Sequence, residues 1–254
     1  MLESLFMVDY LKKIISPILT IVILWEIIIR FFSISPLIVP SPLTVLKAFE
    51  SNFYSLFSQS LLTFVESFLG LLIALVVAFI IVVIFYFFPI LKRYYYSIVV
   101  SFRAIPIIAL APVVVLIIPS YFLSKVVLAA IVAFFPIFIS FSQGVHSLNE
   151  ETLNYINIVN GTTGKVFWHI RLPQALPDLF TGLKISSTFS VMGAIVAEFI
   201  GANNGIGYII KSSTYYYESG LTFAAIICSG IIGLITYSIF SFLEKRLIFW
   251  KKLN

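Results

Sequence analysis

The sequence is short of the residues that keep a protein soluble in water and of those that build disulfides or metal sites. Charged residues make up only 11% of its 254 residues, whereas an ordinary soluble domain has about 25%. Its one cysteine, Cys228, cannot form a disulfide within the chain. Its two histidines, His146 and His169, are too few for a metal site without carboxylates close by.

Hydrophobic residues, by contrast, make up 61% of the chain. A surface with so few charges could not stay hydrated, so the bulk of the chain is expected in a membrane. The net charge of +5 then fits basic residues that flank membrane spans better than a nucleic-acid site. The N-terminal apolar run carries Glu26 and Arg30 near its end and is not followed by a small-residue cleavage site. We therefore interpret it as an uncleaved first span.

A spanning helix needs about 20 mostly apolar residues. Such runs lie at about residues 14–34, 60–88, 94–118, 122–145, 179–200 and 221–244. The predicted fold class is therefore all-α, a polytopic membrane bundle of about six transmembrane helices. With no long linker or repeat, residues 1–254 are expected to form a single domain.

Two of these runs predict particular geometry. The second run exceeds one bilayer thickness, so it should tilt or project into water. The third contains Pro106 and Pro112, which remove backbone donors and should break or kink the helix. Small residues allow helices in lipid to approach closely, so the pair Gly70 and Ala74, or the pair Gly230 and Gly233, are predicted contact points.

The distribution of lysine and arginine predicts the direction of the spans. If the N-terminus is cytoplasmic, the outer connections hold only Arg30, Lys47, Lys125 and Lys211. The inner side then holds Lys12, Lys13, Lys92, Arg93, Lys165, Arg171, Lys184, Lys245, Arg246, Lys251 and Lys252. Because basic residues concentrate in cytoplasmic loops, both termini are predicted to be cytoplasmic.

One polar stretch, residues 148–177, falls on the cytoplasmic side in this topology. Asn160 and Gly161 form a turn signal between two short helical segments, and Pro173 is expected to end the second segment. The predicted result is a helical hairpin with an apolar stripe that fits a groove on a partner. The string GTTGKV at 161–166 lacks the spacing of a phosphate-binding loop, so no ATP site is expected there.

Five motifs in order carry a family resemblance over nearly the whole chain. They are LWE at 24–26, VPSPLTVLKA at 39–48, FRAIPIIALAPVVVLI at 102–117, IRLPQALPDLFTGLKIS at 170–186 and GAIVAEFIGANNGIGYII at 193–210. Together they resemble the type I permease subunits of ATP-binding-cassette (ABC) importers, in the nitrate, sulfonate and taurine branch.

The resemblance implies that residues 148–173 are a cytoplasmic coupling-helix hairpin that docks on an ATPase. The positions that match the family's coupling motif are Asn154, Tyr155, Ile156, Asn160, Gly161, Ile170, Leu172 and Pro173. Asn154, Tyr155 and Ile156 replace the family's Glu-Ala-Ala triplet, and Asn160 replaces its glycine. These departures bear on the geometry of docking, and they are compatible with a non-identical partner.

The resemblance also implies a transport subunit that has no catalytic residue and no cofactor of its own. ATP and Mg²⁺ would bind to the partner ATPase subunits. A second permease copy or a paralogue would complete the path, and an extracytoplasmic binding protein would deliver the solute. That solute would be a sulfonate, nitrate, taurine or bicarbonate-like anion, or a vitamin precursor. No nucleic acid is expected as a partner.

Intramembrane charges and helix breaks are the best sequence markers of a solute path. Arg103, Pro106, Glu198 and Gly201 are therefore predicted path or gate residues. Arg103 could instead snorkel to the cytoplasmic boundary, and Glu198 could instead make a structural hydrogen bond to a neighbouring helix. Glu66 is expected near the outer boundary, solvated.

The rival class is an autonomous membrane protein, either a secondary transporter or an intramembrane enzyme, without an ATPase partner. A secondary transporter should show repeated halves with broken helices. An enzyme should show a nucleophile, acid and base or metal ligands that converge, and the sequence offers no such cluster.

Overall fold

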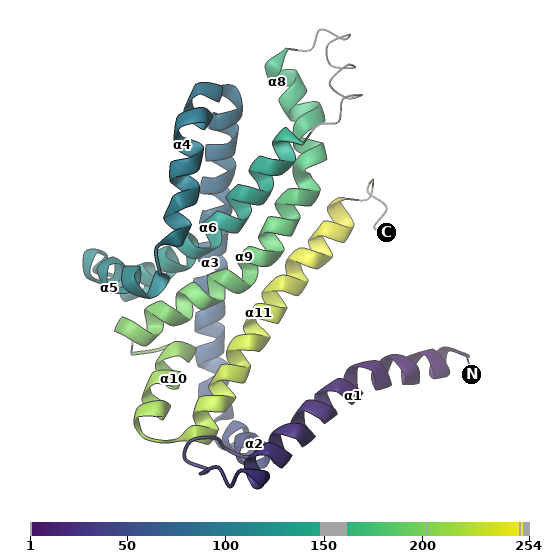
Figure 1. The fold of residues 1–254 in the computed structure, drawn as a ribbon, viewed down its shortest axis with the longest axis vertical. Coiled ribbons are helices and arrows are strands. Elements are labelled where there is room, and N and C mark those ends of the chain that lie inside the picture. The colour runs from purple at the N-terminus through teal and green to yellow at the C-terminus, as the bar shows by residue number, and fades with distance from the viewer. Residues whose placement is uncertain (1, 148–161, 202, 249, 251–254) are drawn as a thin grey trace. The chain divides into compact units, whose positions relative to one another are not determined.

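The computed structural model describes residues 2–147, 162–201, 203–248 and 250, and within them it contains helices and turns but no strand. The predicted all-α class is confirmed. In chain order the elements are α1 (Leu2–Phe31), α2 (Pro42–Ser51), α3 (Phe53–Phe87), α4 (Pro89–Ser101), η1 (Phe102–Ala104), α5 (Ile107–Ile117), α6 (Tyr121–His146), α8 (Thr163–Val166), η2 (Phe167–Arg171), α9 (Leu172–Gly201), α10 (Ile206–Tyr215) and α11 (Ser219–Leu247) (Figure 1).

A helix covers each of the six apolar runs. Among the described residues, four helical segments are long and apolar enough to cross a membrane, namely Phe53–Phe87, Tyr121–His146, Thr163–Gly201 and Ser219–Leu247. In the third run, α4 with η1 meets α5 at an angle of 97°. If these segments are counted together as one broken span, the number of candidate spans is five. The 35 residues of α3 extend for about 52 Å, beyond the hydrocarbon core of about 30 Å, as predicted.

The chain forms two compact units, and the smaller one comprises residues 2–57 and 209–227. Within it, Trp25 of α1 stacks on Phe223 with 5.7 Å between ring centroids. The hydroxyl of Ser219 donates to the carbonyl of Pro36 at 2.6 Å. Ser41 caps α2 by accepting from the Thr44 amide at 3.2 Å, which is the usual role of serine at a helix start.

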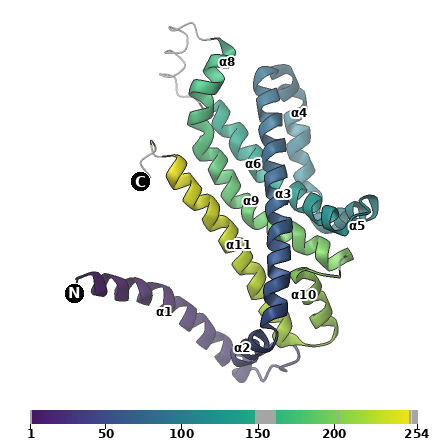
Figure 2. The ribbon, with the colours of Figure 1, turned by 180° about the vertical axis from the view of Figure 1, so that it is seen from behind.

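The larger unit comprises residues 58–208 and 228–254, as far as they are described, and it contains the main apolar core. Helices α6 and α9 run side by side along most of their length in both views (Figures 1 and 2). Their close approach depends on glycine: a Cβ on Gly193 would lie 2.8 Å from Ala129 Cα, and one on Gly182 would lie 2.9 Å from Ile137 Cα. Small residues therefore set the spacing of this pair.

The predicted contact at Gly70 and Ala74 is confirmed. A Cβ on Gly70 would lie 2.6 Å from Ala129 Cβ of α6, and Ala74 is buried. The alternative pair, Gly230 and Gly233, makes no such approach: a Cβ on Gly230 would meet nothing within 4 Å, and one on Gly233 would meet only Thr188, at 3.8 Å.

The prediction that Pro173 ends a helix is wrong. The segment Thr163–Gly201 is one continuous helical stretch, and Pro173 lies inside it. The turn before Pro173, η2, is a π-helix in which the Leu172 amide bonds to the carbonyl of Phe167, five residues back. We attribute the continuity to this wider turn. Pro173 has no N–H to donate, and the π-turn changes which carbonyl groups lie next to it, so the helix continues through this residue.

The predicted break at Pro106 is confirmed. Ile105 before it is extended, with φ −72° and ψ 122°, because a residue that precedes proline is disfavoured in the helical region. Pro106 is itself extended and begins α5. Pro112, by contrast, lies within α5, which continues to Ile117.

Candidate functional site

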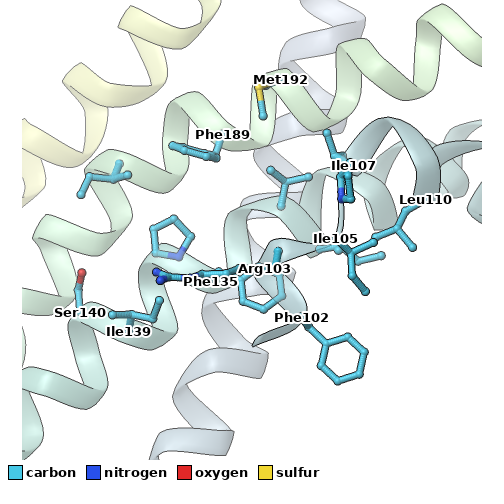
Figure 3. A pocket seen from close by; sticks show the side chains of 16 residues that line it. Phe102, Arg103, Ile105, Ile107, Leu110, Phe135, Ile139, Ser140, Phe189 and Met192 are labelled. Carbon is cyan, nitrogen blue, oxygen red and sulfur yellow. The ribbon is translucent and has the colours of Figure 1, made fainter. Parts of the chain in front are cut away.

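The helix break at residues 103–106 lines one wall of a cleft of about 880 Å³ (Figure 3). The other walls come from α6, through Phe135 and Ser140, and from α9, through Phe189 and Met192. The structure thus brings together two of the four predicted path residues, Arg103 and Pro106.

Within the described part of the chain, Arg103 is the only charged side chain that lines this cleft. It is exposed, and none of the ion pairs formed within the described residues includes it. The rest of the lining is apolar except for Ser140. Figure 3 shows Arg103 extending from the η1 turn across the cleft, with Phe189 and Met192 on the α9 side. A cation with no ion-pair partner in apolar surroundings favours an anion there, because an unpaired charge is costly in such a setting.

Glu198 lies outside the cleft. Its side chain is fully buried, and both carboxylate oxygens accept a hydrogen bond. The Thr63 hydroxyl donates to Oε1 at 2.6 Å, and the Gly207 amide donates to Oε2 at 2.7 Å. Of the two roles considered for Glu198, the structure supports the hydrogen bond to a neighbouring helix.

The bonds to Glu198 belong to a network that fastens the start of α10 to α3. The Ile206 amide donates to Thr63 Oγ1 at 3.0 Å, and the Gly205 amide donates to Gln59 Oε1 at 2.6 Å. These amides belong to the first turn of α10, where backbone donors have no partner within the helix. Gly205 has φ +98°, and a Cβ there would clash with the carboxyl group of Glu198. Glycine is therefore required at this position by both conformation and space.

The expectation that Glu66 is solvated is wrong. Glu66 is fully buried and pairs with Lys125 of α6, which is only 2% exposed. Lys125 Nζ also donates to Asn204 Oδ1 at 2.8 Å. Gln59, Thr63 and Glu66 recur at helical spacing on α3 within an apolar sequence. That polar stripe was the signal that could have indicated a buried network.

Gly201 also lies away from the cleft lining. A Cβ on Gly201 would lie 2.6 Å from Val115 Cγ1, so this glycine permits α9 to pack closely against α5. The structure thus places Glu198, which accepts hydrogen bonds, and Gly201, which lies against Val115, apart from Arg103 and Pro106, which line the cleft.

Three of the predicted coupling positions are described, Ile170, Leu172 and Pro173, and all three are half-buried around η2. The neighbouring Phe167 is fully buried against Tyr86 of α3, with ring centroids 4.8 Å apart. The remaining coupling positions lie outside the described residues: Asn154, Tyr155, Ile156, Asn160 and Gly161. Within the part of the chain that is described, no three His, Cys, Asp or Glu side chains are placed to hold a metal ion.

Comparison with known proteins agrees with this architecture. The family described as "binding-protein-dependent transport system inner membrane component" matches residues 67–249. The formylaminopyrimidine transport permease protein ThiX of Halalkalibacterium halodurans is 29% identical over 92% of this chain and 94% of its own. A protein named aliphatic sulfonates transport permease SsuC of Bacillus subtilis is 25% identical over 95% of this chain and 88% of its own.

A solved structure shares the fold. A chain of the MetNI methionine ABC transporter, in a study of its inward-facing conformations, aligns with a TM-score of 0.64 and 18% identity. The alignment covers 78% of this chain and 98% of that one.

Proposed function

The chain belongs to the binding-protein-dependent transport system inner membrane component family, and from that premise we propose that it carries a small anion through the membrane along the Arg103 cleft. The membrane-spanning permease function follows from the family. The sign of the solute's charge rests on one observation: Arg103 has no ion-pair partner among the described residues, and the cleft that it lines is apolar apart from Ser140. Sulfonates, which the name of the Bacillus subtilis relative carries, are anions of this kind.

We further propose that cytoplasmic ATPase subunits bind ATP and Mg²⁺ and dock on residues 148–173. The continuous helix Thr163–Gly201 supports this mechanism. Phe189, on the cleft, lies 16 residues beyond Pro173, or about 24 Å along the helix. A helix of this length transmits a displacement at its coupling end to the cleft wall. A second permease subunit and an extracytoplasmic binding protein complete the proposed importer, with both termini of this chain in the cytoplasm.

Uptake by the reconstituted complex tests the proposal. The chain is reconstituted in vesicles with its ATPase and binding protein, and uptake of a radiolabelled sulfonate is measured with ATP or with an ion gradient alone. Uptake that needs ATP and the ATPase supports the importer. Uptake by the chain alone, driven by an ion gradient, would instead establish the autonomous secondary transporter.

Arg103→Ala tests the role of the cleft. Loss of one charge-assisted hydrogen bond, worth about 1.5–3 kcal/mol, predicts uptake that is about 10- to 100-fold weaker at low solute concentration. ATPase association should not change, because Arg103 lies in η1, outside the proposed docking segment at residues 148–173. The control is Lys47→Ala, which removes an exposed charge from α2. Equal uptake by the two variants would remove Arg103 from the path.

A further inference from the structure

Three basic side chains gather where α4 begins and where α6 and η2 end. Lys92, His146 and Arg171 lie close enough for their charges to repel one another. We call them the basic cluster. None of the ion pairs within the described residues includes a member of this cluster. Like charges that gather without an ion pair among the described residues are unfavourable unless an anion offsets the repulsion.

Aromatic rings and carbonyl groups hold these cations in place. Lys92 Nζ lies 5.9 Å from the ring centroid of Tyr96, and the Arg171 guanidinium lies 5.3 Å from that of Tyr86. Arg171 Nη1 donates to the carbonyl of Val145 at 2.7 Å, whereas its buried Nε has no hydrogen-bond partner among the described residues. Arg171 therefore has a hydrogen-bond donor left to offer beside the Lys92 ammonium group. A phosphate group satisfies both.

An apolar groove of about 430 Å³ lies between α3, α4 and α6. All the side chains that line it are apolar, among them Ile73, Val77 and Ile81 of α3, Val99 of α4 and Phe134 of α6. Ile73 and Val77 are 45% and 41% exposed, so the groove is open to the surroundings of the helices. Both views show α3 and α4 side by side, joined by a short turn (Figures 1 and 2).

Along α4, the groove begins about two helical turns from Lys92 of the basic cluster and continues away from it. Along α4, Val99 is seven residues, or about 10 Å, from Lys92, and Phe102 is about 15 Å from it. Half of the hydrocarbon core is also about 15 Å. Tyr94 and Tyr95, beside Lys92, are 65% and 51% exposed, as is usual at the level of lipid headgroups.

We propose that one anionic glycerophospholipid binds here, with its phosphate at the basic cluster and one acyl chain in the groove. Positive charge selects an anionic headgroup, and the apolar lining selects a hydrocarbon chain. The spacing of the two features matches one lipid in one leaflet. That leaflet is the cytoplasmic one, a detail that rests on the orientation given under the proposed function.

Native mass spectrometry of the purified full chain tests the headgroup half of this site. The probes are phosphatidylglycerol and phosphatidylcholine with the same acyl chains. The wild type should bind phosphatidylglycerol more tightly. Lys92→Gln should weaken its binding about fivefold, the factor expected for one basic side chain at a membrane surface. The matched control is Arg93→Gln, which removes the neighbouring exposed charge outside the cluster. Equal affinity for the two lipids, or equal effects of the two variants, would overturn the proposal.

Filling the groove tests the acyl-chain half. Val77→Trp places a large ring in the groove and should displace the lipid, whereas Val76→Trp, 56% exposed and outside the lining, should not. Retention of the lipid by Val77→Trp would exclude the groove. If Lys92→Gln released the ATPase and left phosphatidylglycerol binding unchanged, the cluster would be a contact for an acidic protein surface instead. ATP-driven uptake in phosphatidylcholine vesicles is measured in parallel, so that failure of the lipid site and failure of the importer function give different results.

Discussion

Glu66 and Lys125 form a buried ion pair, so the stability of the protein should depend strongly on the presence of both charges. Replacement of Glu66 with leucine leaves the Lys125 ammonium buried, with the Asn204 side chain as its remaining hydrogen-bond partner. Replacement of Lys125 with methionine leaves the Glu66 carboxylate buried and uncompensated. Each single variant should therefore lose much more stability than a change of shape alone would cause.

The magnitude follows from burial. Removal of one partner of a buried ion pair costs about 3–5 kcal/mol, whereas replacement of both by apolar groups of similar size is often close to neutral. The double variant Glu66→Leu with Lys125→Met should therefore be more stable than either single variant, although it still leaves Asn204 without its donor. The coupling energy should reach at least about 3 kcal/mol, the upper end for residues in direct contact.

A double-mutant cycle on the purified chain measures this coupling from the free energies of unfolding in detergent. The control cycle uses Glu26→Ala and Arg30→Ala, an ion pair at 2.7 Å that is open to the surroundings and lies one helical turn apart on α1. Exposed pairs of this spacing couple by only about 0.2–0.5 kcal/mol. Additive losses in the Glu66 and Lys125 cycle, or a coupling no larger than that of the control, would refute the buried pair.

Three further predictions concern topology, packing and coupling. A cysteine at Tyr216 should react with a membrane-impermeant reagent from outside intact cells, and one at Thr163 only after the membrane is opened; the reverse pattern would invert the proposed orientation. Gly193→Leu should lower the free energy of unfolding by more than about 3 kcal/mol, because its Cβ would lie 2.8 Å from Ala129 Cα, whereas Gly230→Ala should be nearly neutral. Gly161→Pro should leave membrane insertion intact while ATPase association and uptake fall together; uptake at the wild-type rate would separate this segment from coupling.

Features that depend on neighbouring residues in the sequence were predictable. Long apolar runs predicted the helices, because a membrane span must satisfy its backbone hydrogen bonds internally. Pro106 gave the position of the break, because the rule for the residue before a proline is local. The same kind of local rule failed at Pro173, since the π-turn from Phe167 to Arg171 lets the helix continue through it. Whether the helix continues through Pro173 depends on which carbonyl groups of the preceding turn lie next to it, and the composition of the sequence does not reveal this.

Features that join distant segments were not predictable from their own surroundings. Glu66 and Lys125 each stand in an apolar stretch, and only the packing of α3 on α6 brings the two charges together. Gly205 is a similar case. Its sequence context suggests a turn, but the tighter constraint is the Glu198 carboxyl group that occupies the space of a side chain. A polar residue in an apolar helix therefore indicates that a partner exists, without identifying it.

These pairings also change the charge count on which the proposed orientation depends. Lys125 is buried against Glu66, so we no longer count it among the free basic residues of the outer connections. Lys184 is similarly paired with Glu244 of α11 at 2.6 Å, so we no longer count it among the free basic residues of the inner side. Removing one residue from the short outer set and one from the long inner set makes the ratio more unequal. With ten inner and three outer basic residues left, the count still favours the proposed cytoplasmic orientation of both termini.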